Sequence, residues 1–215
     1  MHRGNCILRR LPFGSIYVYS PIGSCAVSKR SRLLRTLLKD GDAAFLERYA
    51  ARACRACGEN QALGRLLDPR SVLIPVPGSA PCAAPGESVA ARLAQALMHH
   101  GIGCSVWPGL QRVHAVQKSA TAGAGGRPTV LRHYESLAIA QNAAGLERIL
   151  LVDDVITKGR TLLAAAARVR EAYPQAQIGA FALLRTQGLL PEVNCLLQPC
   201  VGEIRWRAGD ACRRP

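Results

Sequence analysis

The sequence predicts an α/β fold in which a central, mostly parallel β-sheet is flanked by helices. Short β-rich segments alternate along the chain with longer segments that carry apolar residues at helical spacing. Residues 149–152, ILLV, are apolar without interruption, which is typical of a strand buried on both faces. This alternation favours parallel pairing, and the ligands of such sheets gather at the carboxyl ends of the strands.

The first elements follow from residue type and spacing. Residues 15–20, SIYVYS, predict a strand because Ile, Val and Tyr favour a pleated surface. Leucines on one face predict a helix over residues 27–39 that ends at Gly41. A second helix is predicted over residues 43–57 and ends at Gly58.

The middle of the chain contains weaker patterns. Residues 71–77, SVLIPVP, predict a strand, residues 87–100 a helix, and residues 104–107 another short strand. Residues 111–140 show little periodicity, and the glycines within residues 122–126 indicate a mobile segment.

The last third of the chain returns to clear alternation. The strand at residues 149–152 precedes a helix predicted over residues 161–173, which Pro174 closes. A strand is predicted over residues 177–184. We expect residues 201–207 to form an edge strand, followed by a loose tail.

Length and composition predict a globular cytoplasmic protein. The 215 residues suit one ordinary domain, and the 49% of apolar residues suffices for a core. No apolar run reaches the roughly 18–20 residues that span a bilayer. The N-terminal residues lack the apolar segment of a secretory signal. We therefore expect no membrane partner.

The nine cysteines are an odd number scattered over the chain, which indicates reduced thiols rather than a disulfide framework. Cys54 and Cys57 form a CxxC pair. A structural zinc would need two further ligands, which Cys6, Cys25 or Cys82 could supply through the fold. We favour the interpretation that the CxxC pair is two thiols on one helix.

The net charge of +14, from 28 Lys and Arg against 14 Asp and Glu, implies an anionic partner or substrate. Nucleic acid is one possibility and a phosphorylated metabolite is another. The basic residues are spread along the chain. Aromatic residues make up only 5%, so stacking platforms for single strands would be sparse.

Two adjacent acids, Asp153 and Asp154, follow the apolar segment. Like charges at a strand terminus are unfavourable unless a partner binds them, and vicinal sugar hydroxyls can do so. The following loop leads directly into a helix N-terminus, where backbone amides favour a phosphate and Gly159 permits its close approach. Thr157 and Thr161 add hydroxyl donors. The pattern predicts a site for a phosphorylated sugar.

Residues 149–161, ILLVDDVITKGRT, resemble the signature of type I phosphoribosyltransferases. The resemblance implies that this loop binds 5-phosphoribosyl-1-pyrophosphate (PRPP), that Asp153 and Asp154 are catalytic and contact the ribose hydroxyls, and that Mg²⁺ is a cofactor held mainly through the substrate. The further residues expected at PRPP are Val155, Thr157, Lys158, Gly159, Arg160, Thr161, Val76, Pro77, Arg112 and Lys118. Of the signature cations, we expect Arg160 to point outward.

The chain is also similar, more loosely and over about residues 15–187, to the ComF-like, competence-associated branch of the family. The similarity includes Tyr17-Val18-Tyr19, Leu38-Lys39, the strand end at residues 74–77, and the Arg112/Gln117 region. Two departures are clear. The zinc ribbon of that branch is missing, and the loop after Pro77, which corresponds to the family's pyrophosphate loop, has no basic residue before position 92.

The resemblance implies a flexible hood over residues 111–140. Within it, Arg112, Lys118 and Arg127 could supply cations to the leaving diphosphate, and closure of the hood would exclude water. His114 and His133 could act as acid–base groups. The alternative is a solvated basic loop with ordinary histidines.

We therefore predict three parts: an N-terminal strand and helices (residues 1–70), a phosphoribosyltransferase-like core with its hood (residues 71–187), and a C-terminal edge strand and tail (residues 188–215). The predicted function is transfer of phosphoribose from PRPP to an acceptor, with release of pyrophosphate. The alternatives are a PRPP- or nucleotide-binding regulator without turnover and a DNA-associated accessory protein. An oligomer is compatible with each of them.

Overall fold

The computed structural model describes residues 8–81, 87–117, 127–140, 143, 145–188 and 192–215. Strands and helices alternate through most of this length. In chain order the elements are β1 (Arg10–Tyr19), α1 (Ala26–Asp40), α2 (Ala43–Glu59), α3 (Gln61–Leu66), β2 (Val72–Pro75), α4 (Val89–His99), β3 (Ser105–Val106), β4 (Leu110–Arg112), α5 (Val130–Glu135), β5 (Leu137–Ile139), β6 (Arg148–Ile156), α6 (Arg160–Ala172), β7 (Gln177–Thr186), β8 (Leu197–Arg207) and β9 (Asp210–Arg214).

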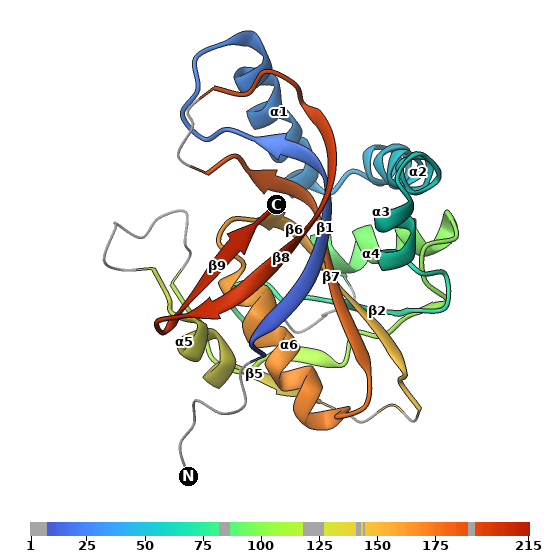
Figure 1. Cartoon of the computed structure of the whole chain (residues 1–215), viewed down its shortest axis with the longest axis vertical. Helices are drawn as coiled ribbons and strands as arrows, with labels where there is room; N and C mark the ends of the chain where they lie inside the picture. The colour runs from blue at the N-terminus through green and yellow to red at the C-terminus, as the bar shows by residue number, and fades with distance from the viewer. Residues whose placement is uncertain (1–7, 82–86, 118–126, 141–142, 144, 189–191) are drawn as a thin grey trace.

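Seven strands form the main sheet in the order β3-β2-β6-β7-β1-β8-β9. The first five are parallel to one another, whereas β8 pairs antiparallel with β1 and β9 pairs antiparallel with β8. Strand β6 lies at the centre of the parallel part (Figure 1). The expected α/β class and the mostly parallel sheet are confirmed.

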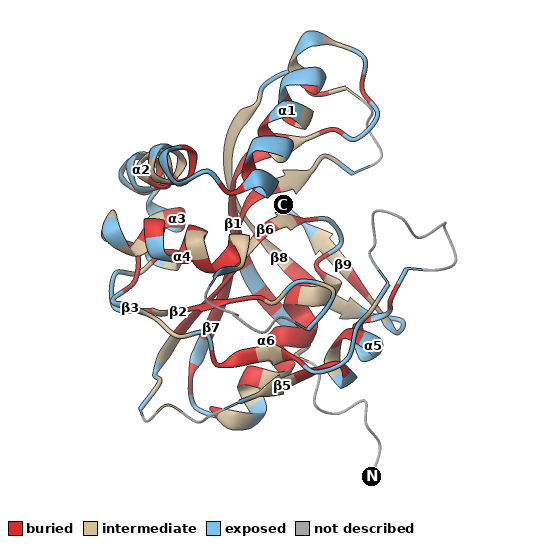
Figure 2. Cartoon of the chain, turned by 180° about the vertical axis from the view of Figure 1, so that it is seen from behind, coloured by how far each residue is buried: buried red, intermediate tan, exposed pale blue. Residues whose placement is uncertain are grey.

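Helices cover both faces of this sheet (Figure 2). On one face, α1 to α4 pack over a core that includes Ile16, Phe45 and Leu97. On the other face, α6 packs with α5 and the paired strands β4 and β5 over a core that includes Phe13 and Leu163. The two layers of helices leave the carboxyl end of β6 between them.

Side-chain caps fix where several helices begin. Cys25, Asp42, Asn60, Ser88 and Thr129 each accept a hydrogen bond from a backbone amide in the first turn of α1, α2, α3, α4 and α5, respectively. Helix α6 is different, since its N-cap is a glycine and makes no side-chain cap.

Residues 111–140, whose sequence shows little periodicity, contain regular structure in their described parts. Strands β4 and β5 form a separate two-stranded antiparallel sheet, with Leu110 opposite Ile139, and α5 lies between them in the chain. Helix α5 packs against α6. The sequence did not reveal these elements, because they are too short to show periodicity. The glycines at residues 122–126 lie outside the described residues.

The C-terminal part also differs from expectation. Strand β8 is not an edge strand, because it pairs with β1 on one side and β9 on the other. The expected loose tail forms β9, which is the edge. Ala208 and Gly209 join the two strands with φ angles of 47° and 79°, which suit a tight hairpin turn.

The predicted helices are confirmed, with small shifts of their ends. The predicted strands are found as well, but β1 begins at Arg10, β6 continues to Ile156 and β8 begins at Leu197, several residues beyond the predicted bounds. Cys54 and Cys57 lie together on α2, as expected for two thiols on one helix. The N-terminal strand β1 lies inside the main sheet, between β7 and β8, so the three predicted parts of the chain share one sheet. None of the described helices combines the length and apolarity needed to cross a bilayer.

Candidate functional site

The sequence signature forms a strand, a tight loop and the start of a helix. Strand β6 continues through Ile156, and α6 begins at Arg160. Gly159 is in the left-handed region, with φ of 85°, and is the N-cap of α6. Because no side chain of a described residue caps α6, the amides of its first turn are available to an anion.

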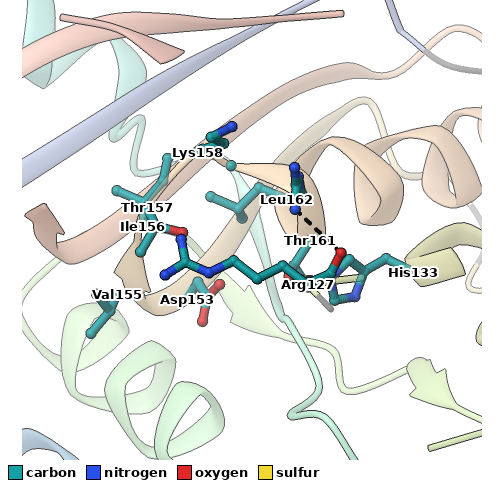
Figure 3. Close-up of a pocket in the computed structure, with 11 residues that line it drawn as sticks. Arg127, His133, Asp153, Val155, Ile156, Thr157, Lys158, Thr161 and Leu162 are labelled. Carbon is teal, nitrogen blue, oxygen red and sulfur yellow. Dashed lines mark hydrogen bonds between the residues drawn. The ribbon is translucent and has the colours of Figure 1, made fainter. Parts of the chain in front are cut away.

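A pocket opens over this loop. It is bounded by β6 and its loop, the N-terminus of α6, and two residues of the hood (Figure 3). Its lining residues are Arg127, His133, Asp153, Val155, Ile156, Thr157, Lys158, Gly159, Arg160, Thr161 and Leu162. The expected loop residues and one of the two expected acids are therefore brought together.

The two acids face opposite sides of the sheet. Asp153 lines the pocket, whereas Asp154 is buried on the other face and forms an ion pair with Lys39 of α1. The reason is geometric: both residues lie within β6 rather than after it, and neighbouring side chains of a strand alternate between its faces. The expectation that both carboxylates face one ligand is not met in this structure.

Asp153 has an unusual electrostatic environment. Burial raises the pKa of Asp153, the adjacent charge of Asp154 raises it further, and Lys39 acts in the opposite direction. Its carboxylate accepts a hydrogen bond from the amide of Asp154 at 2.8 Å, and Asp154 accepts one from the amide of Val155 at 2.7 Å. Asp153 thus offers the pocket a carboxyl group that holds its proton more tightly than usual.

Arg112 belongs to β4 and is buried, with 5% exposure. Its guanidinium donates hydrogen bonds to the carbonyls of Gly78 and Pro77 and to the hydroxyl of Ser136. Burial lowers the pKa of Arg112 to about 10, which the nearby Asp153 partly offsets, so the side chain stays cationic at neutral pH. The alternative that Arg112 belongs to a solvated basic loop was wrong, because Arg112 is buried in β4 and fixes the loop after β2 to the hood.

His133 lies on α5, with 5% exposure, and lines the same pocket. Its Nε2 is 3.5 Å from Oγ1 of Thr161, and its Nδ1 is buried without a hydrogen-bond partner among the described residues. Burial lowers the pKa of His133 to about 4, with further lowering by Arg112 and Arg160. The ring is therefore neutral at neutral pH.

The two cations of the signature converge on Asp210, the first residue of β9. Arg160 donates to both carboxylate oxygens of Asp210, at 2.5 Å and 2.6 Å, and Lys158 donates at 3.3 Å. Arg160 also contacts the carbonyl of Pro128 at 3.3 Å. The expectation that Arg160 points outward was wrong, because the C-terminal hairpin supplies an acid that sequence distance conceals.

The remaining predicted residues are placed as follows. Val76 packs in the core, and its amide donates to the carbonyl of Val152 at 2.8 Å, while Pro77 accepts from Arg112. Lys118 lies outside the described residues. Arg127 is exposed, and Figure 3 shows its side chain extending along the pocket toward Asp153.

Several residues of the site region were not found from the sequence. Three of them contact signature residues from distant parts of the chain: Lys39, Ile204 and Asp210. The fourth is Ser136, which accepts a hydrogen bond from Arg112 within the hood. One local signal existed for Asp210, because a glycine directly precedes it and glycine before a β-rich segment favours a hairpin turn. The others required knowledge of strand order.

Metal ligands are sparse in the described residues, where no cluster of three or more His, Cys, Asp or Glu side chains could hold a metal ion. Asp153 is the acid that faces the pocket. A single carboxylate suits Mg²⁺ bound mainly by substrate phosphates rather than by a protein cage. Comparisons of the sequence with protein-family models and with curated proteins gave no match.

Proposed function

We propose that this protein binds PRPP and transfers its phosphoribosyl group to an acceptor, with release of pyrophosphate. The observation that carries the proposal is the pocket itself, which is lined both by the N-terminus of α6, uncapped by any side chain of the described residues, and by Asp153. One end of the pocket suits a phosphate and the other suits sugar hydroxyls. PRPP carries both groups, separated by a few bonds.

The 5′-phosphate is assigned to the loop and the first turn of α6. The amides of this turn and the helix dipole favour an anion, and the hydroxyls of Thr157 and Thr161 add donors. Gly159 has no side chain to stand between the phosphate and the backbone. The two cations, Lys158 and Arg160, add positive potential although Asp210 offsets part of it.

The ribose hydroxyls are assigned to Asp153. A carboxylate at this position accepts hydrogen bonds from the sugar, which offsets the burial that raises its pKa. Asp154 supports this role from the other face, where its pairing with Lys39 holds the end of β6. Asp153 is the catalytic residue of this proposal, acting as a carboxylate, and Asp154 positions it.

In the proposed reaction the bond between C1 and the pyrophosphate oxygen breaks, and a bond forms between C1 and a nucleophile of the acceptor. Positive charge develops on the ribose ring and negative charge on the departing diphosphate. Asp153 lies on the side where positive charge needs stabilisation, and Arg127 is the described hood cation that lines the pocket. Mg²⁺, held mainly by the diphosphate, would neutralise the leaving group, and Asp153 is the acid lining the pocket that could help to hold it.

Binding is tested by calorimetric titration of the protein with PRPP and Mg²⁺. We expect saturable binding, and we expect Asp153→Asn to weaken it about tenfold or more, because the amide cannot offer two accepting oxygens to the sugar hydroxyls. Asp68→Asn is the control: it makes the same carboxyl-to-amide change at a residue that pairs with Arg70 and Arg148 and lines another pocket. Unchanged affinity in Asp153→Asn would contradict the site assignment.

Turnover is tested separately by measuring pyrophosphate release from PRPP in the presence of a panel of nucleobases. Release that depends on a base supports the transferase. Binding without release favours the alternative of a PRPP-binding regulator, for which the involvement of Arg112, Lys158 and Arg160 in internal contacts is the supporting observation. The third possible result is a DNA-associated role, which the net charge of +14 would favour. Its signature would be DNA binding that weakens with salt and changes when PRPP is added.

A further inference from the structure

His133 has a position that phosphate binding by the loop alone does not require. It comes from the hood helix α5, yet its ring lies against the N-terminus of α6, where Nε2 is 3.5 Å from the Thr161 hydroxyl. Thr161 is the second residue of α6 and lines the pocket. The ring and the hydroxyl therefore form a pair at the point where an anion would meet the helix.

The protonation state of the pair follows from its surroundings. The side chain of His133 is buried, and the guanidinium groups of Arg112 and Arg160 are close enough to oppose an imidazolium. A neutral imidazole carries one proton, on either Nδ1 or Nε2. Which nitrogen carries it decides whether the ring donates to Thr161 or accepts from it.

The tautomer is set by the partners of the two nitrogens. Nδ1 is buried and has no hydrogen-bond partner among the described residues, whereas Nε2 faces the oxygen of Thr161. A proton on Nδ1 would leave a buried N–H donor unsatisfied, which native structures avoid. With the proton on Nε2, the ring donates to Oγ1 of Thr161, and the remaining lone pair on Nδ1 is the smaller defect.

We propose that His133 is a positioning residue that donates from Nε2 to Thr161 and thereby presets the Thr161 hydroxyl as a donor to the bound phosphate. Once Oγ1 accepts from the ring, the hydroxyl proton of Thr161 is free to point into the pocket. A phosphate oxygen, which only accepts, is the chemical group that such a donor recognises. This inference rests on the proposed phosphate site. It adds that phosphate binding depends on a hood side chain, His133, which orients the Thr161 hydroxyl.

The first test measures the tautomer in the unliganded wild-type protein. Nitrogen-15 NMR of the histidine side chains, with His133 assigned by comparison with His133→Gln, distinguishes protonated Nε2 from protonated Nδ1. We expect the Nε2–H form at neutral pH. A spectrum showing the Nδ1–H form would overturn the proposal, whatever the protein binds.

The second test is a double-mutant cycle read by the affinity for ribose 5-phosphate, which has the phosphate but no leaving group. We expect Thr161→Val and His133→Leu each to weaken binding by about tenfold, the effect of one well-placed hydrogen bond. The double variant should bind no more weakly than Thr161→Val alone, because the ring acts only through the hydroxyl. His133→Gln, whose amide can still donate, should recover most of the affinity.

The outcomes separate this inference from the proposed function. Failure of the wild-type protein to bind ribose 5-phosphate would overturn the phosphate site and the positioning role together. Wild-type binding with fully additive losses in the cycle, or with no loss in His133→Leu, would overturn the positioning role alone. Circular dichroism and thermal unfolding of each variant identify any that fails to fold, and the wild-type tautomer then decides.

Discussion

Asp153 is the residue at which stability and binding oppose each other. It lines the pocket, and its charged form is disfavoured first by burial and then by Asp154. Asp154 has Lys39 as a partner on the other face, whereas Asp153 makes no ion pair with a described residue. A carboxyl group kept in this state is unfavourable for folding but is available to a ligand.

We expect Asp153→Asn to stabilise the unliganded protein at neutral and higher pH. Since the pKa of Asp153 is raised in the folded state, the folded protein holds this proton more tightly than the unfolded chain does. Stability from this group is therefore complete below the pKa of the unfolded chain and is lost as pH rises through the folded pKa. The gain should be about 1–2 kcal/mol in the free energy of unfolding at pH 8.

Urea unfolding between pH 4 and pH 9 measures this effect. The wild-type protein should lose stability with rising pH relative to Asp153→Asn. Asp154→Asn is the neighbouring control and should destabilise the protein by about 1–3 kcal/mol, because it leaves the Lys39 ammonium without its buried partner. Stabilisation by both substitutions would show that simple repulsion between the acids, rather than the burial of Asp153, dominates.

At this scale the sequence identifies the residues but not their directions. The acid pair, the threonines and Gly159 are recognisable because their types and spacing carry the chemistry of a sugar phosphate. The sides to which Asp153 and Asp154 point depend on where β6 ends. That end is set by pairing with β7, which extends to Ile156 opposite Arg185 and leaves no local mark in the sequence.

Among the elements, the loop between β6 and α6 depends on close packing against β8. A Cβ added at Gly159 would lie 2.7 Å from Cδ1 of Ile204, and the residue has a φ of 85°. The loop conformation thus requires glycine for two separate reasons, the backbone angle and the contact with β8. An alanine at this position would have an unfavourable backbone angle, and its Cβ would push Ile204 of β8 aside.

We expect Gly159→Ala to lower the free energy of unfolding by about 2–4 kcal/mol, the sum of left-handed strain and overpacking. Gly188→Ala is a matched control, because Gly188 also has a φ of 85° but a Cβ there would meet no atom of the described residues within 4 Å. It should lose only about 1 kcal/mol. Equal losses in thermal or urea unfolding would mean that Ile204 does not constrain the loop.

Elements were predictable where periodicity was long enough to read. Helices α1, α2, α4 and α6 have repeated apolar positions over eleven residues or more, and their ends agree closely with the structure. The hood elements β4, α5 and β5 have three to six residues each. These short elements are held in place by tertiary contacts, such as the hydrogen bond from Arg112 to Ser136, which a single sequence does not reveal.

Across the whole molecule, the C-terminal hairpin acts on the site from a distance of about fifty residues in the chain. Asp210 binds both cations of the signature loop, so its negative charge lies beside the proposed phosphate position. The pKa of Asp210 is lowered to about 2, primarily by its hydrogen bonds with Arg160, and the group is fully charged at neutral pH. The hairpin therefore supports the loop and weakens its positive potential.

We expect Asp210→Asn to bind ribose 5-phosphate about two- to fivefold more tightly while losing about 1 kcal/mol of stability, because one negative charge leaves the rim and one ion pair is lost. Titration calorimetry and thermal unfolding give the two quantities. Asp68→Asn, which breaks a comparable arginine pair at the other pocket, should lose stability without any change in affinity. Weaker phosphate binding by Asp210→Asn would indicate that the hairpin chiefly orients Arg160.

At the scale of the whole molecule, the sequence predicted the class of fold but not the order of the strands in the sheet. Alternating elements indicated a mostly parallel sheet, which the structure confirms. The position of β1 between β7 and β8, and the closure of the sheet by β9, follow from long-range pairing. These pairings decide which distant residues, such as Lys39 and Asp210, reach the signature.

The alternation of Asp153 and Asp154 across β6 has a final consequence. Two carboxyl groups joined by one peptide bond belong to different compartments of the molecule, one open to the pocket and one facing α1. The two carboxyl groups interact electrostatically, so neutralising the charge of Asp153 changes the electrostatic field at Asp154 and at its partner Lys39. A spectroscopic probe attached near the end of α1 would therefore report occupancy on the opposite face, with no movement of the sheet between them.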